Sequence, residues 1–408
     1  MLANWQMDMW SSIIGLFGFI PSFGFMIIVF TICLKIILSP LDFYNKKISR
    51  ESGIKQARIQ PKLEKLKKQY KDPKVFQQKQ MELYKKEGYN IYGSCLFMLL
   101  NLAVTLFIFI TLWMGLSQMA QDRILKQYQE IQTTFETTFY QEFEKIGKDK
   151  DTVNRELNNL AESYRLDALN QLQREYNIES IDEEKLTTEQ KQRLLTIQMN
   201  YAYSEISKEN NITDTAVETA AQHYEEIKSG WLWIDNIWQP DTYVAGFPDY
   251  RGFARTVNIS QMVNNNKITE EEFKNIYSKY DVITSKIQAN YNSWNGYFIL
   301  VILAGAVTYF SFIITQMIST KKKDKDKNTE QNEATPAKTM SIMKFLMPAL
   351  MIYFTCTYSA AFALYIVVNS AMSLLTSFVS LKILEKMDKN KPQEPIENKK
   401  IKKVEYSR

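Results

Sequence analysis

The stretch from Gly24 to Leu41, GFMIIVFTICLKIILSPL, restricts the fold of this chain most, because it is apolar except for one charge, Lys35. A helix rises about 1.5 Å per residue, so the stretch extends roughly 27 Å, close to the ~30 Å hydrocarbon core of a bilayer. Lys35 would lie roughly 9 Å inside one end of such a span. An ammonium there usually faces a bundle interior or a wet cavity, but it can also reach the headgroups along its own chain. Position alone leaves both interpretations open.

Four more apolar runs, near 93–116, 296–318, 341–357 and 360–382, have the length and composition of membrane spans. Only Tyr358 and Ser359 separate the last two, which predicts a tight hairpin or one re-entrant pair. The sequence therefore predicts an all-α polytopic membrane protein with five transmembrane helices, although the mean hydropathy is −0.29. The expected segments are an outer interfacial segment (1–21), transmembrane helices (22–41, 93–117, 296–318, 341–357 and 358–382), a cytoplasmic helical hairpin (42–92), extracellular helical insertions (118–295), a cytoplasmic loop (319–340) and a basic, disordered cytoplasmic tail (383–408).

Charge is distributed unevenly between the polar segments. Residues 42–92 hold 14 Lys/Arg and 6 Asp/Glu, a net +8, whereas residues 117–294 hold 19 and 29, a net −10. Loops rich in Lys and Arg stay on the cytoplasmic side of a membrane. We therefore expect the N-terminus and 117–294 outside, and 42–92, 319–340 and the C-terminus inside.

The segment 42–92 has the signals of two helices joined by a turn. Asp72-Pro73 supplies an N-cap and a proline at the first helical position, and Gly88 is a typical C-cap. Its lysines are compatible with a solvated face, with anionic lipid near the inner leaflet, or with ribosomal RNA phosphates. Nothing in the segment reads nucleic-acid bases, so no DNA partner is expected.

The external segment 118–230 is polar but carries an apolar repeat of three to four residues, which is typical of one helix face. The repeat consists of Ile124, Tyr128, Ile131, Phe135, Phe139, Phe143 and Ile146. We expect the second span to continue outward as a long helix, and 118–230 and 269–291 to form a compact helical cap.

Two aromatic stretches predict contact with the outer headgroups, where tryptophan is enriched. In the N-terminal segment Trp10, Ile13, Ile14 and Phe17 share one helical face. In the segment 231–241, WLWIDNIWQPD, three tryptophans follow one another closely.

No motif for catalysis or cofactor binding is present in the sequence. It has no P-loop, no Gly-rich dinucleotide turn and no nucleophile elbow. The three cysteines all fall in apolar runs, and there is one histidine. These counts argue against a disulfide framework and a Cys/His metal site, so we expect no cofactor and no metal.

Two blocks carry a resemblance to a known family. The first block resembles the first span, hairpin and second span of the YidC-type membrane protein insertases (the Oxa/Alb/YidC family). It reads KIILSPLDFYNKK, followed by IQPKLEKLKKQYKDPKVFQQKQMELYKKEGYNIYGSCLFMLLN. ILAGAVTYF and FLMPALMIYFTCTYSAAFALYIVVNSAMSLL look like its remaining spans, and WIDNIWQPD looks like the segment before the third span. About 200 of the 408 residues are covered. The absence of a large β-rich domain resembles the Gram-positive type, with extra extracellular insertions.

The resemblance implies a hydrophilic intramembrane groove open to the cytoplasm and to lipid. Substrate groove positions carry over to Lys35, Asn101, Thr105, Ser311, Thr315, Tyr365, Ile366 and Asn369. Lys35 stands where the family usually has arginine, Ser311 replaces glutamine and Ile366 replaces tryptophan. Because lysine lacks the fork of donors that arginine offers, the groove of this chain should be less polar.

The implied function is to help integral membrane proteins insert into the cell membrane and fold, alone or with the Sec translocon. Expected partners are nascent membrane proteins, the ribosome and anionic lipid. No covalent chemistry is implied, so the chain would not be an enzyme, although a classification as a translocase is compatible with this function.

Two alternatives come from other classes of protein. A small-solute transporter or channel with an extracellular helical domain would need a polar path across the whole membrane, whereas the polar positions cluster in the inner half. A surface receptor anchored by its spans would not need an intramembrane lysine.

Overall fold

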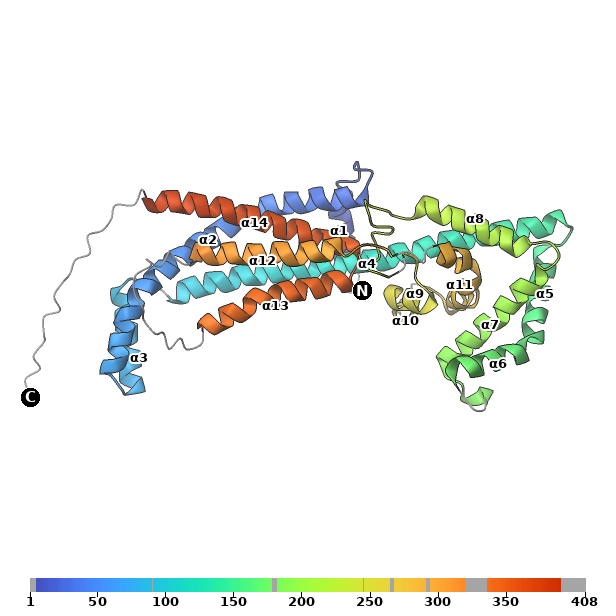
Figure 1. The fold of residues 1–408 in the computed structure, drawn as a ribbon, viewed down its shortest axis with the longest axis horizontal. Coiled ribbons are helices and arrows are strands. Elements are labelled where there is room, and N and C mark those ends of the chain that lie inside the picture. Colours follow the sequence, from blue (N-terminus) through green and yellow to red (C-terminus); the bar gives the residue numbers. More distant parts are fainter. Residues whose placement is uncertain are drawn as a thin grey trace, which may run out of the picture. The chain divides into compact units, whose positions relative to one another are not determined.

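The computed structural model describes residues 5–89, 91–177, 182–244, 246–264, 268–290, 294–319 and 336–389, and every regular element in these ranges is helical (Figure 1). The predicted all-α fold is therefore confirmed. The chain divides into two compact units. The large unit comprises Met1–Leu34, Val104–Tyr309 and Ala334–Ser370, and the small unit comprises Lys35–Ala103, Phe310–Glu333 and Ala371–Arg408.

The helices in chain order are α1 (Trp5–Gly15), α2 (Phe23–Gln69), α3 (Pro73–Lys86), α4 (Ile91–Lys145), α5 (Lys150–Ser163), α6 (Arg165–Tyr176), the 3₁₀ turn η1 (Glu183–Lys185), α7 (Thr188–Ile206), α8 (Ile212–Ile227), α9 (Tyr250–Val257), α10 (Ile259–Asn264), α11 (Glu270–Asn290), α12 (Ile299–Ser319), α13 (Pro336–Thr357) and α14 (Ala360–Lys389). Four helices, α2, α4, α12 and α14, contribute residues to both units.

Three helices among the described residues are long and apolar enough to cross a membrane. They include Phe23–Gly53 of α2, Leu99–Lys145 of α4 and Ala360–Met387 of α14. Ile299–Thr315 of α12 and Lys344–Thr357 of α13 are shorter apolar helices, and α12 and α13 adjoin the undescribed residues 320–335. The chain is a multi-pass membrane protein, and three of its five expected spans meet the length criterion.

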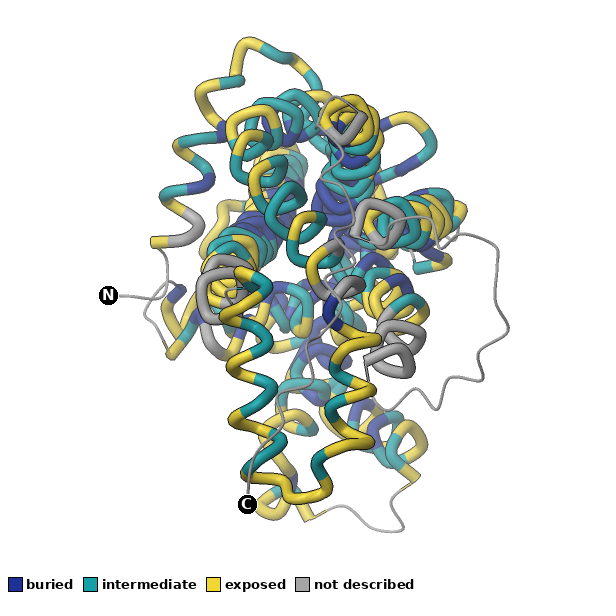
Figure 2. The backbone as a smooth tube through the Cα atoms, turned by 90° about the vertical axis from the view of Figure 1, so that its left-hand side faces the viewer, coloured by how far each residue is buried: buried dark blue, intermediate teal, exposed yellow. Residues whose placement is uncertain are grey.

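The small unit contains the turn predicted from the charged segment. Asp72 Oδ1 accepts a hydrogen bond from the backbone N–H of Lys74 at 2.8 Å, and Gly88 ends the second helix with a φ of +62°. Lys62 Nζ contacts Glu87 Oε1 at 2.5 Å, so α3 folds back beside α2. No residue of α3 is buried; its residues are intermediate or exposed, the teal and yellow classes of the tube in Figure 2. The first of the two expected helices does not begin within residues 42–92, because it is the continuation of α2, which runs unbroken from Phe23 to Gln69.

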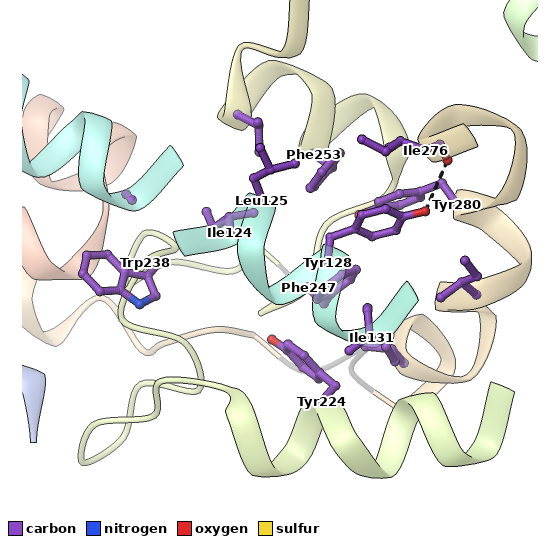
Figure 3. Close-up of a cluster of buried hydrophobic side chains, with 14 of the residues drawn as sticks. Ile124, Leu125, Tyr128, Ile131, Tyr224, Trp238, Phe247, Phe253, Ile276 and Tyr280 are labelled. Carbon is purple, nitrogen blue, oxygen red and sulfur yellow. Dashed lines mark hydrogen bonds between the residues drawn. The ribbon is translucent and has the colours of Figure 1, made fainter. Parts of the chain in front are cut away.

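The large unit contains the packed helical domain that the apolar repeat predicts. α4 continues to Lys145, and the repeat from Ile124 to Phe143 is at most 2% exposed. Tyr128 stacks on Tyr280 of α11 with ring centroids 4.9 Å apart, and its hydroxyl donates to the backbone oxygen of Ile276 at 3.3 Å (Figure 3). The compact packing is confirmed for the described residues.

The last position of the repeat was predicted wrongly. Ile146 is 49% exposed, because α4 ends at Lys145 and Gly147 turns the chain with a φ of +80°.

Residues 231–244, here called the junction segment, connect this domain to the starts of apolar helices in the large unit. The backbone oxygens of Ile237 and Gln239 accept hydrogen bonds from the N–H groups of Ala361 and Ala360 at 2.9 and 2.8 Å, so they cap the N-terminus of α14. Asp241 Oδ2 accepts from the N–H of Leu300 at 2.7 Å near the start of α12. The junction segment therefore satisfies helix-end donors that would otherwise be orphaned.

Two of the three tryptophans of the junction segment, Trp231 and Trp238, do not lie where the sequence predicts, whereas Trp233 is half-buried. Trp231 is 8% and Trp238 is 2% exposed, so protein rather than lipid headgroups covers them. Trp231 packs so closely on α2 that a Cβ at Gly24 would come within 2.3 Å of its ring. Exposed aromatic side chains of the large unit include Tyr243 of the same segment, at 66%, and Trp294 and Tyr297, at 56% and 63%.

The apolar face of α1 shows the same difference. Trp10 is 5% and Ile14 is 1% exposed, and the Trp10 ring lies 5.8 Å from that of Phe30 in α2. The face is therefore buried on protein. The expected loop (319–340) and disordered tail (383–408) fall mostly on residues 320–335 and 390–408, outside the described residues. The expected bounds are wrong where these segments are described, because residues 336–340 belong to α13 and residues 383–389 to α14.

Candidate functional site

The charged site is built on one face of α2 in the small unit. Lys35 Nζ lies 3.5 Å from Asp42 Oδ2, and the two side chains are 12% and 24% exposed. Seven residues make nearly two helical turns, so the pair shares one face of the helix. Lys46 lies four residues further on the same face and interacts electrostatically with both groups. The intramembrane lysine of the sequence is thus covered by protein and paired with a carboxylate.

The small unit holds three more of the predicted groove residues. Asn101 of α4 and Ser311 of α12 are half-buried, whereas Thr315 is exposed. Thr315 Oγ1 donates to the backbone oxygen of Ser311 at 2.9 Å, one turn earlier in α12.

The other four predicted groove residues belong to the large unit. Thr105 is exposed and Asn369 is half-buried. Tyr365 and Ile366 are only 3% and 2% exposed, so both are core residues of α14. A groove formed by all eight residues stays a prediction, because they are divided between the two units.

A buried polar network in the large unit holds the junction segment in place. Asn295, 0% exposed, donates from Nδ2 to the backbone oxygens of Asn236 and Pro240 at 3.0 and 2.8 Å. Its Oδ1 accepts from the N–H of Asn236 at 2.7 Å. The side chain of Asn236 in turn donates to Gln127 of α4 and to the hydroxyl of Tyr224 in α8. The side chain of Asn295 therefore connects two segments that lie about sixty residues apart in sequence.

Sequence reasoning identified Lys35 but missed its partner Asp42. The seven-residue spacing on a helix was an available signal. Asn236 and Asn295 carried no such signal, because only tertiary folding brings them together.

The site offers charge and hydrogen bonds rather than a metal cluster. Among the described residues no group of three or more His, Cys, Asp or Glu side chains could hold a metal ion, and Cys33 and Cys356 are free thiols.

Comparison with known proteins gives matches over the region that contains α2, α3 and α4. Residues 15–149 match the sequence model of the family described as 60Kd inner membrane protein. Lys35 and Asp42 lie within this match, whereas the predicted groove residues of α12 and α14 lie outside it.

Three curated relatives carry the name Membrane protein insertase YidC. The protein from Clostridium tetani is 43% identical over 81 residues, which are 20% of this chain and 35% of the relative. The proteins from Caldanaerobacter subterraneus and Thermotoga maritima are 39% and 36% identical over 87 and 92 residues, or 21% and 22% of this chain. The matches cover 40% and 19% of those relatives, so the chain spans at most about two fifths of these three proteins. No solved structure gives a significant match.

Proposed function

We propose that this chain, which belongs to the YidC-type insertase family through its match over residues 15–149, helps integral membrane proteins to insert into the membrane and fold. The observation that carries the proposal is Lys35: it lies inside a candidate span, yet 12% of its side chain is exposed and it is paired with Asp42. Side chains of this kind inside a membrane are costly and usually mark a functional path.

In this proposal Lys35 lies in a hydrophilic groove open to the cytoplasm and to lipid. By the family resemblance, Asn101, Thr105, Ser311, Thr315 and Asn369 would supply its hydrogen-bonding groups, and Tyr365 and Ile366 would be its remaining residues. A polar tail of a substrate would enter the groove instead of crossing bare hydrocarbon. Unpaired polar groups cost several kcal/mol in hydrocarbon, so such a groove lowers the barrier to translocation.

The driving force in this scheme is burial of the substrate's own apolar segment in lipid. A segment of about twenty apolar residues spans the bilayer and needs no nucleotide or covalent step to insert. The protein would therefore act by lowering a barrier.

The proposal extends to topology and partners. We infer five spans in the cell membrane, with α12 and α13 as the two shorter ones, the N-terminus outside and the C-terminus in the cytoplasm. Nascent membrane proteins would be the substrates. The basic segment of α2 and α3 would face the ribosome, the Sec translocon or anionic lipid, because its net charge of +8 attracts anionic surfaces.

The test uses the full-length protein in lipid vesicles and a model substrate with one span and a short acidic N-terminal tail. Protease protection of the tail measures insertion. We expect Lys35→Ala to lower the initial rate by about tenfold, equivalent to about 1.4 kcal/mol. Lys68→Ala is the matched control, because Lys68 is an exposed lysine of the same helix. Protection no greater than in protein-free vesicles would refute the proposed function.

A further inference from the structure

The carboxylate of Asp42 occupies the position that an acidic substrate group would need. Its Oδ2 lies 3.5 Å from Lys35 Nζ, and both side chains are mostly covered. Side chains of a helix lean toward its N-terminus, so Asp42 leans toward the turn of Lys35. An isolated ammonium in this environment would be strongly unfavourable, and the nearby carboxylate compensates it.

A second cation lies beyond the carboxylate on the same face. Lys46 follows Asp42 by four residues, the spacing at which an acidic residue followed by a basic one attract each other along a helix. Lys46 Nζ also lies 3.5 Å from Thr376 Oγ1 of α14, within the small unit. Along this face Asp42 therefore lies between two lysines: it pairs with Lys35 at 3.5 Å, and its charge also acts on Lys46.

We propose that Asp42 is a specificity-determining residue, acting as the resident counter-ion that an acidic substrate must displace from Lys35. The inference rests on the proposed function and adds a charge-exchange step to it. When a substrate carboxylate pairs with Lys35, Asp42 turns to Lys46, so each carboxylate keeps an ammonium partner. No covalent bond changes and no proton is transferred.

This arrangement sets a selectivity rather than an on-off requirement. A neutral tail leaves the Lys35–Asp42 pair intact and gains nothing from Lys35. An acidic tail can form an ion pair with Lys35 only by displacing Asp42 from it. Removing the carboxylate should therefore favour acidic tails over neutral ones, while removing Lys46 should disfavour them because displaced Asp42 then lacks a partner.

The test measures insertion of two substrates that differ only in two tail positions, both Asp or both Asn. The readout is the ratio of their initial rates in vesicles that contain the full-length protein. We expect Asp42→Asn to raise the acidic-to-neutral ratio about threefold or more, and Lys46→Gln to lower it, since contacting charged residues are energetically coupled. Glu64→Gln is the matched control: Glu64 is an exposed acidic residue of α2, and its variant should leave the ratio unchanged.

The outcomes separate this inference from the proposed function. If the wild type inserts both substrates but Asp42→Asn leaves the ratio unchanged, only the exchange step is refuted. An equal loss for both substrates would assign Asp42 a structural role and would also refute it. If the wild type inserts neither substrate faster than protein-free vesicles do, the proposed function is refuted, and the exchange step is refuted with it.

Discussion

Asn295 gives the sharpest test of how the junction segment is held. Its side chain makes three hydrogen bonds to backbone groups of Asn236 and Pro240, and it is 0% exposed. Replacing it with alanine leaves the buried N–H of Asn236 without this partner, whereas the oxygens of Asn236 and Pro240 still accept from the N–H groups of Gln239 and Thr242 at 3.0 and 2.9 Å. One buried N–H left without a partner costs about 1–3 kcal/mol, so Asn295→Ala should lower the free energy of unfolding by about that amount.

The backbone of residue 295 makes its own contacts, which the substitution keeps. Its N–H donates to Val244 at 2.7 Å and its oxygen accepts from Asp235 at 3.0 Å, so the variant isolates the side-chain contribution. The assay is denaturant unfolding of the purified protein in detergent, followed by tryptophan fluorescence. Asn159→Ala, at an exposed position of α5, is the control and should change stability by less than about 0.5 kcal/mol. A loss below about 1 kcal/mol for Asn295→Ala would refute the reasoning.

Three further predictions follow from the packing of the large unit. Phe139→Ala should lower the free energy of unfolding by about 3–5 kcal/mol, because this ring is 1% exposed and contacts Phe143 and Tyr203. The control Ile146→Ala should change it little, and equal effects of the two variants in unfolding experiments would contradict this prediction. Gly24→Ala should lower the free energy of unfolding by about 1–3 kcal/mol, because the Trp231 ring would have to move away from the added methyl group. An unchanged denaturant midpoint would contradict this, since it would show that the ring moves at no cost. Burial opposes ionisation of Glu136, but Lys279 and hydrogen bonds outweigh it and lower the pKa of this carboxyl from 4.5. The stability gained from ionised Glu136 is therefore present above about pH 4.5 and lost as the pH falls through the lowered value, and Glu136→Gln should flatten this part of the pH profile.

Much of the fold could be predicted because its signals are local. The turn at Asp72-Pro73 and Gly88, the break between α13 and α14, and the buried face of α4 all follow from residues close together in sequence. The repeat fails only at Ile146, where the helix ends before the periodicity does.

The environment of the apolar faces could not be predicted, because lipid and protein are both apolar. Trp10, Trp231 and Trp238 satisfy the pattern of a headgroup belt, but their partners are α2 and other protein segments. The candidate site shows the same limit. Lys35 was recognisable from its depth in a span, whereas the role of Asn295 depends on a contact with a segment fifty-nine residues away.

The unbroken course of α4 through the large unit restricts how this chain can change in length. From Val104 to Lys145 it contributes two sets of side chains to the buried core, Leu112 and Leu116 first and then the face from Tyr128 to Phe143. Each residue added between these sets would rotate one relative to the other by about 100° and shift it by about 1.5 Å. Seven added residues would restore the phase to within about 20°. Viable length variants between Leu116 and Ile124 should therefore differ by whole pairs of turns.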